Sequence, residues 1–446
     1  MKRMFKPYKE DKPLITVNKI RSVSISLRQT THLRFRQGVH ADNGFYTEEL
    51  LNYLEGKNNK YIMADNRQIK KLIIIFIAIT TLPFVKLYAQ NEPEVNFYRH
   101  YNGTLGKNMV IVADMMSIRN IVSGYYFYYF LDPETRKVNR YSKTIPVKGE
   151  VTGDKIVFYE FNNVSSKYTG TIDGDGNISG SWLKSDRDKP LPFEMKIDYS
   201  EGSFPLWCYT LYDNYYLIDG LTGNSAPQAK IDIAVLYPRN VSGPVGDSVK
   251  QTISAHLSGD NSLIKSPVKF MENLKTEFFG LYKKSTDGIE DFSNTASFVW
   301  DKRIVMKVLY NKNNILSIKY EKSVNTGGSH SISMTEFSIF DLKTGKQLLL
   351  TDFLKPGYLE KMTNLVNEGL REMNGIKEGE PLTQSGFFTD TINLSNDFYI
   401  NNDGIGFFYN VYEIAPFSAG TTDIFISFGK FKEFIKPGVF KWVNLK

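Results

Sequence analysis

Short runs of aromatic and β-branched residues, separated by turn residues, dominate the chain from about residue 97 to residue 200. Examples are Gly124–Phe130, Lys155–Glu160, Tyr168–Ile172 and Asn177–Trp182. These residue types favour pleated strands, and the Gly-Asp-Gly-Asn sequence at 174–177 is typical of a hairpin turn. No long helical period interrupts the runs. The pattern predicts an antiparallel all-β meander that curls into a small barrel or sandwich.

A different pattern follows the breaker-rich segment at 221–228, which we interpret as a linker. After a strand at Ala229–Tyr237, helical spacing appears at about Asp247–Leu257, Pro267–Lys284 and Tyr358–Met373, with further strands between. In the second helix, Phe278 and Leu281 are expected to face the sheet. Mixed helices and antiparallel strands predict an α+β domain. We therefore expect a β-rich domain at 90–220, an α+β domain at 229–438 and a tail at 439–446.

A hydrophobic leader at 63–89 predicts export. Basic residues precede an almost wholly apolar run at 72–82, and the small residue Ala89 stands before Gln90. This is the order of a signal peptide cleaved between Ala89 and Gln90. The apolar run is shorter than the roughly 20 residues that span a bilayer, and no cysteine near the cleavage point offers a lipid anchor. We expect a periplasmic or extracellular protein that is not a lipoprotein and meets the membrane only transiently.

Residues 1–62 precede the leader and are basic and weakly patterned, so we interpret them as a non-native or disordered extension. The formal net charge of +7 comes from this end: residues 1–89 hold 16 Lys and Arg against 7 Asp and Glu, which leaves 39 against 41 in residues 90–446. A nearly neutral body lacks the strong positive field that attracts phosphate backbones. We expect no nucleic-acid partner.

Four short motifs stand out in the second half of the chain. They are Gly327-Gly-Ser-His330, Phe340-Asp-Leu-Lys-Thr-Gly-Lys346, Phe398-Tyr399 and Tyr412-Glu-Ile-Ala-Pro416. In this order and spacing, the region from about 229 to 438 resembles the extracytoplasmic domain family found in the anti-sigma factor RsiV and in the peptidoglycan deacetylase PdaC. The resemblance implies an α+β fold in the cell envelope and, for the RsiV branch, lysozyme binding.

The resemblance also implies a set of binding positions, namely Gly327, Gly328, His330, Tyr412, Glu413 and Pro416. His330 beside Ser329 can be posed as a base and a nucleophile, but adjacent side chains usually point apart. The competing interpretation is that the two glycines permit a tight turn, which His330 holds by hydrogen bonding. Glu413 is either a general base or an acid in a strand-to-loop corner. We favour the structural interpretation for both residues.

No catalytic or metal-binding constellation is evident in the sequence. After Ala89 the histidines are His100, His256 and His330, too scattered to indicate a zinc site, and we expect no cofactor. The single cysteine, Cys208, is interpreted as a buried, inert thiol. We expect an exported cell-envelope binding module whose partner is lysozyme or cell-wall glycan. The alternatives are a membrane-anchored sensor like an anti-sigma factor and an envelope glycan hydrolase that uses Glu413 or His330.

Overall fold

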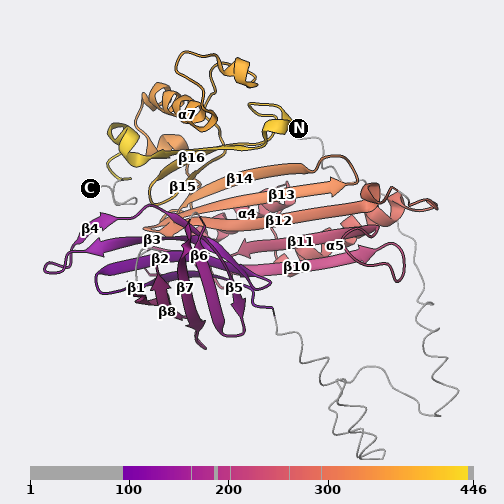
Figure 1. Cartoon of the computed structure of the whole chain (residues 1–446), viewed down its shortest axis with the longest axis horizontal. Coiled ribbons are helices and arrows are strands. Elements are labelled where there is room, and N and C mark those ends of the chain that lie inside the picture. Colours follow the sequence, from indigo (N-terminus) through magenta and orange to yellow (C-terminus); the bar gives the residue numbers. More distant parts are fainter. Residues whose placement is uncertain are drawn as a thin grey trace, which may run out of the picture. The chain divides into compact units, whose positions relative to one another are not determined.

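The computed structural model describes residues 94–439, apart from residues 162, 185–188, 201, 261 and 293. These residues lie within one compact unit, Glu92–Lys446. The extension expected at 1–62, the leader at 63–89 with its cleavage site at Ala89 and Gln90, and most of the expected tail lie outside the described residues. The described part is mainly β with a few helices, which confirms the predicted fold class (Figure 1).

The first third of the described chain, from Phe97 to Ile197, is a β barrel. Its strands are β1 (Phe97–Leu105), β2 (Met109–Ile118), β3 (Ile121–Leu131), β4 (Val138–Tyr141), β5 (Ile145–Thr152), β6 (Lys155–Glu160), β7 (Asn163–Ile172), β8 (Ile178–Leu183) and β9 (Leu191–Ile197). Their order is β2-β1-β9-β8-β7-β6-β5-β3-β4, and β2 also pairs with β3. The sheet therefore closes on itself, with β4 as an extra strand beside β3. Closure removes the unpaired edges that an open meander would expose.

Aromatic side chains fill the barrel. Tyr101, Tyr126, Phe158 and Tyr168 are almost completely buried there. The rings of Phe158 and Tyr168 stack with their centroids 4.4 Å apart, and Tyr126 meets Tyr168 edge-on at 5.7 Å. Such pairs stabilise a core by about 0.5–1.5 kcal/mol each beyond the area that they bury. The aromatic runs of the sequence thus supply the barrel core.

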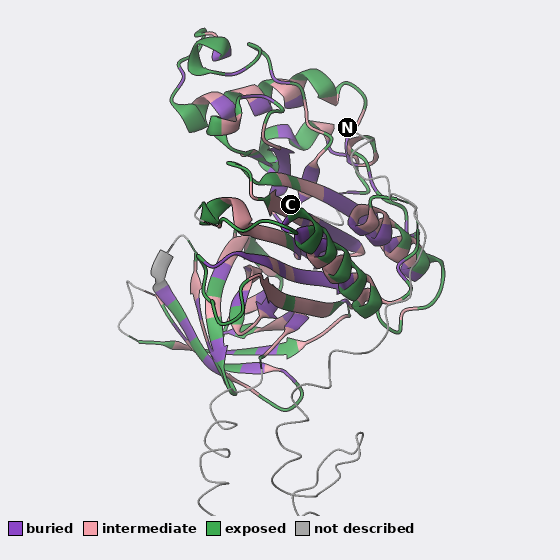
Figure 2. Cartoon of the chain, turned by 90° about the vertical axis from the view of Figure 1, so that its right-hand side faces the viewer, coloured by how far each residue is buried: buried purple, intermediate pink, exposed green. Residues whose placement is uncertain are grey.

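A five-stranded sheet follows the barrel. Its strands are β10 (Trp207–Tyr216), β11 (Gln228–Tyr237), β12 (Val299–Lys312), β13 (Ile315–Thr326) and β14 (Ile332–Asp341), in that order across the sheet. Only β11 and β12 are parallel, because α4 (Pro244–Ser258) and α5 (Pro267–Ser285) form the crossover between them. In Figure 2, the helices over this sheet are exposed on their outer side and buried where they meet the strands.

Two details of this sheet differ from the sequence analysis. Strand β10 precedes the linker expected at 221–228 but pairs along its whole length with β11, so the chain changes sheets before Trp207. In α5, Leu281 is 60% exposed, whereas Tyr282 is fully buried. Tyr282 follows Phe278 by one helical turn and shares its face, which places Leu281 on the outer side.

The C-terminal part is a small sheet covered by a helix. Strands β15 (Phe398–Ile400), β16 (Gly404–Tyr409) and β17 (Thr422–Ser427) form the sheet, and α6 (Leu350–Phe353) and α7 (Tyr358–Asn374) precede it. Four 3-10 helices complete the described chain: η1 (Thr295–Phe298), η2 (Leu382–Ser385), η3 (Phe417–Ala419) and η4 (Phe428–Phe434). Helix α7 packs closely on β17, since a Cβ on Gly369 would lie 2.9 Å from Ile424 Cγ2.

Buried polar contacts join the barrel to the five-stranded sheet. The hydroxyl of Tyr98 donates to Asp114 Oδ1 over 2.7 Å and accepts from Asn311 Nδ2 over 2.9 Å. His100, which is fully buried, lies 2.9 Å from the same carboxylate through its Nδ1. Tyr98 and Asp114 come from the barrel and Asn311 from β12. The barrel and the α+β part therefore share one continuous interior.

Candidate functional site

Two loops that are distant in the sequence meet beside the C-terminal sheet. One connects β13 to β14 and carries His330, and the other follows β16 and carries Tyr412. The His330 ring lies 4.4 Å from the ring of Phe417, and Tyr412 lies 5.7 Å from the same ring, measured between centroids. Two of the predicted binding positions are thus brought together through Phe417, a residue that the sequence analysis did not select.

Tyr412 is held in an unusual backbone conformation. Its φ angle is +68°, in the left-handed region that side chains other than glycine rarely adopt, and its side chain is 62% exposed. The turn around it is closed at both ends: Glu413 N donates to Asn410 O over 3.2 Å, and Asn410 N donates to Glu413 Oε2 over 3.0 Å. The turn therefore directs a large aromatic ring into solvent. Such strain clusters at sites that recognise ligands.

The remaining predicted positions have separate roles. Gly327 has a φ of +84°, and a Cβ there would lie 2.0 Å from the carbonyl oxygen of Ser297, so only glycine fits. Gly328 has ample space around it. Pro416 immediately precedes η3 and so positions Phe417. Glu413 anchors the turn through its carboxylate and also lines a pocket.

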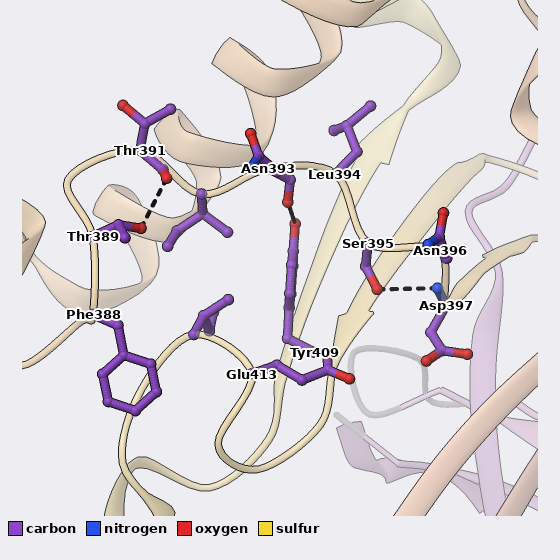
Figure 3. A pocket seen from close by; sticks show the side chains of 12 residues that line it. Phe388, Thr389, Thr391, Asn393, Leu394, Ser395, Asn396, Asp397, Tyr409 and Glu413 are labelled. Atoms are coloured by element: carbon purple, nitrogen blue, oxygen red, sulfur yellow. Dashed lines mark hydrogen bonds between the residues drawn. The ribbon is translucent and has the colours of Figure 1, made fainter. Parts of the chain in front are cut away.

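A pocket adjoins this turn, and Glu413 is one of the residues that line it. Its volume is about 470 Å³, and Figure 3 shows the side chains around it. They are Phe388, Thr389, Thr391, Ile392, Asn393, Leu394, Ser395, Asn396, Asp397, Tyr409, Glu413 and Ile414. Phe388 and Asp397 stand at opposite ends of the row, with Tyr409 and Glu413 between them. The lining combines hydroxyls, amides and carboxylates with aromatic rings, of which Phe388 is half exposed.

Internal hydrogen bonds fix the segment that forms the pocket. The hydroxyl of Tyr409 donates to Asn393 O over 2.7 Å, and Asp397 N donates to Ser395 Oγ over 3.0 Å. Thr389 Oγ1 donates to Thr391 O over 2.9 Å. Within the described residues, the side-chain amides of Asn393 and Asn396 make no hydrogen bond. These amides are available to a ligand.

Asp397 is a pocket residue whose carboxyl group has a strongly shifted pKa. Its pKa is raised to about 6, first because burial disfavours the charged carboxylate and then because Glu413 and Glu336 repel it. His256 and Lys322 act in the opposite direction but more weakly. Both of these side chains contact Glu336, since Lys322 Nζ contacts its carboxylate and His256 Nδ1 lies 3.6 Å from it. A carboxyl group with a raised pKa in an open pocket is a common feature of functional sites.

Asn410 connects this pocket to the five-stranded sheet. Its side chain accepts from Thr335 N over 2.7 Å and donates to Thr335 O over 3.0 Å, as a neighbouring strand would. The same Nδ2 lies 3.5 Å from Asp397 Oδ2. Asn410 therefore completes the edge of β14 and at the same time holds the pocket against it.

Other chemistry has little support in the described chain. No group of three or more His, Cys, Asp or Glu side chains there is arranged to hold a metal ion. Burial raises the pKa of Cys208 to about 12, so this thiol is unreactive at neutral pH. In the described segments, no helix combines the length and the apolar character needed to cross a membrane.

The sequence analysis missed four residues of this region: Phe388, Asp397, Asn410 and Phe417. Two local signals were present, since Phe417 directly follows the Tyr412–Pro416 motif and Asp397 directly precedes Phe398-Tyr399. Neither signal indicates proximity to His330 or Glu413. That proximity arises only when β15 of the C-terminal sheet packs against β13 and β14.

Comparison with known proteins locates a recognised domain in this part of the chain. Residues 351–429 match a family model described as a protein of unknown function, DUF3298. The matched segment contains the pocket together with Tyr412, Glu413 and Pro416, whereas Gly327, Gly328 and His330 precede it. The chain therefore contains a DUF3298 domain. This match does not name RsiV or PdaC, so the more specific resemblance remains a prediction.

Two solved structures are similar to the chain. A DUF3298 family protein from Bacteroides fragilis is 24% identical, with a TM-score of 0.46, and the match covers 54% of this chain and 98% of that one. A DUF3298 family protein from Pseudomonas aeruginosa is 18% identical, with a TM-score of 0.36 and coverage of 53% and 97%. No curated protein matches this chain.

Proposed function

We propose that this chain is an exported cell-envelope binding module and that the pocket at residues 388–414 binds cell-wall glycan. The observation that carries the proposal is the lining of the pocket. It combines carboxylates, and amides that make no hydrogen bond within the described residues, with an exposed aromatic ring at one end. Vicinal sugar hydroxyls need hydrogen-bond partners of this kind, and the apolar face of a sugar ring packs on an aromatic ring. A few convergent polar groups in a partly apolar cleft are typical of ligand sites.

The cellular address in this proposal rests on the leader at 63–89. Export with cleavage after Ala89 would bring the binding module to the glycan of the cell envelope. Mass-spectrometric determination of the mature N-terminus tests this part of the proposal. A mature protein that begins at Gln90 supports export, whereas a retained leader would favour the membrane-anchored sensor.

Retention of the purified protein on insoluble peptidoglycan tests the binding function. We expect the wild type to sediment with peptidoglycan and Phe388→Ala to remain largely in solution, because the variant loses the ring that packs on the sugar. Leu281→Ala removes a similarly exposed apolar side chain from α5 and should sediment like the wild type. Retention of the same proteins on immobilised lysozyme is measured in parallel. Retention by lysozyme alone would move the ligand from glycan to protein, and retention by neither would refute the binding module.

The carboxylates of Asp397 and Glu413 also support a second candidate, a glycan hydrolase at the same pocket. Hydrolysis of a glycosidic bond needs one protonated and one ionised carboxyl group, and the raised pKa of Asp397 allows it to carry a proton near pH 6. The peptidoglycan samples can be assayed for new reducing ends. Their formation by the wild type and their absence with Asp397→Asn would replace binding by hydrolysis.

A further inference from the structure

We propose that Asp397 and Glu413 make this pocket selective for uncharged glycan segments and exclude acidic ones at neutral pH. The inference rests on the proposed function and specifies its ligand class. It concerns the charge of the two carboxylates, whereas the proposed function rests on the lining of the pocket as a whole.

The carboxylates of Asp397 and Glu413 are not neutralised by ion pairs within the described residues. Within the part of the chain that the structure describes, no Lys, Arg or His forms an ion pair with Asp397 or Glu413. Their polar contacts are neutral: Asn410 N donates to Glu413 Oε2 over 3.0 Å, and Asn410 Nδ2 lies 3.5 Å from Asp397 Oδ2. These contacts orient the carboxylates without cancelling their charge. The pocket therefore presents negative charge when both groups are ionised.

The other titratable groups that act on Asp397 do not reverse this sign. Glu413 lies in the turn after β16, Glu336 on β14, Lys322 on β13 and His256 on α4, and all four influence the Asp397 carboxylate. Lys322 and His256 both pair with Glu336. Glu336 is thus compensated, and the uncompensated charge remains on Asp397 and Glu413.

Ligand charge matters at this site because the Asp397 carboxylate is half-buried, whereas Glu413 is exposed. A sugar hydroxyl or amide N–H can donate to a carboxylate oxygen, so a neutral glycan gains hydrogen bonds there. A carboxylate on the ligand would gain none. It would be repelled by half-buried Asp397 in a medium less polarisable than water, and more weakly by exposed Glu413. Repulsion of about 1.4 kcal/mol already corresponds to a tenfold loss of affinity.

Acidification should relax the selectivity. Because the pKa of Asp397 is about 6, this group is largely neutral at pH 5 and largely ionised at pH 7.5. A protonated carboxyl group can donate a hydrogen bond to an acidic sugar. The preference for neutral glycan is therefore expected to fall as pH falls through 6.

Calorimetric titration of the full chain with three short oligosaccharides tests the inference. The neutral probe is a tetrasaccharide of N-acetylglucosamine, the acidic probe is a hyaluronan tetrasaccharide, and the third probe is the methyl ester of the acidic one. At pH 7.5, we expect the neutral probe and the ester to bind about tenfold more tightly than the acidic probe. At pH 5 the difference should shrink to about threefold or less.

Variants assign the effect to the carboxylates. Asp397→Asn should reduce the preference at pH 7.5 and remove most of its pH dependence, while the exposed Glu378→Gln makes the same charge change outside the pocket and should leave both unchanged. Equal binding of the acidic probe and its ester at pH 7.5 would overturn the selectivity and leave the proposed function standing. Failure of all three probes to bind would overturn both.

Discussion

At the scale of single residues, Tyr412 combines a strained backbone conformation with an exposed aromatic ring. Its left-handed backbone costs about 1 kcal/mol in a residue that has a Cβ. The hydrogen bonds between Asn410 and Glu413 impose that conformation, and the ring then contacts Phe417. This backbone strain is not offset by packing in the core, because the Tyr412 side chain is exposed. Ligand contact is the role that we propose for this exposed ring.

Replacement of Tyr412 should separate stability from binding. Tyr412→Gly removes the backbone strain, so we expect the free energy of unfolding to rise by up to about 1 kcal/mol while peptidoglycan retention falls. Urea denaturation and sedimentation measure the two effects. As a control, Gly386→Ala introduces a Cβ at a φ of +90° in open space and should lower stability by about 1 kcal/mol without affecting retention. A lower free energy of unfolding in Tyr412→Gly would contradict the interpretation that the Tyr412 backbone is strained.

Asp397 should make stability depend on pH in a defined direction. Its pKa rises from 3.8 to about 6 on folding, so the protonated form favours the folded state. This contribution is complete below pH 3.8 and is lost as pH rises through 6. We expect Asp397→Asn to raise the free energy of unfolding by about 1 kcal/mol at pH 7.5, after allowance for partial exposure, and to change it little at pH 4. Urea denaturation at both pH values measures the change in the free energy of unfolding. An equal change at pH 4 and pH 7.5 would contradict the role of the Asp397 charge.

At the scale of secondary-structure elements, the edge of β14 determines how the C-terminal sheet is attached. Edge strands expose backbone groups that can pair with other chains. Here the amide of Asn410 satisfies both backbone groups of Thr335, and Gly327 allows the preceding turn to approach Ser297 closely. The pocket is therefore built against an edge that a single side chain completes.

Removal of that side chain should destabilise the edge. In Asn410→Ala, the N–H and C=O of Thr335 lose their partners in a half-buried position, and we expect a loss of about 1–3 kcal/mol in the free energy of unfolding. Light scattering during heating should also show earlier aggregation, since the edge becomes available. Asn396→Ala removes an asparagine amide that makes no hydrogen bond within the described residues and is the matched control. Equal stability of the two variants would contradict the role of Asn410.

At the scale of the whole described molecule, a buried polar network unites the barrel with the five-stranded sheet. The side chain of Asn311 accepts from Phe204 N over 2.7 Å, donates to Phe204 O over 2.8 Å and donates to the Tyr98 hydroxyl over 2.9 Å. Beyond it, Phe127 of the barrel stacks on Tyr310 of β12, with ring centroids 6.4 Å apart. Contacts of this kind couple the two parts energetically.

Loss of Asn311 should therefore affect both parts together. Asn311→Ala leaves three polar groups without their partner, and we expect a loss of about 3 kcal/mol or more in the free energy of unfolding. Calorimetry should still show one transition, at a lower temperature. Two separate transitions, with only one displaced, would show that the barrel and the sheet unfold independently.

The sequence by itself determined the local elements. Alternating aromatic and β-branched residues specified the barrel strands, and apolar residues at helical spacing specified α4, α5 and α7, because both periods are properties of consecutive residues. Two of the four motifs, Phe398-Tyr399 and Tyr412–Pro416, lie within residues 351–429, which match the DUF3298 model. These signals need no knowledge of distant contacts.

Only the tertiary structure decided how those elements combine. Closure of the barrel depends on the pairing of β2 with β3 while β1 meets β9, and the transfer of β10 to the second sheet depends on its pairing with β11. The contact of His330 with Phe417 and the raised pKa of Asp397 each require groups from separate segments to meet. Proximity and burial, which set ring contacts and pKa values, arise from packing between residues far apart in the chain and so leave no local pattern in the sequence.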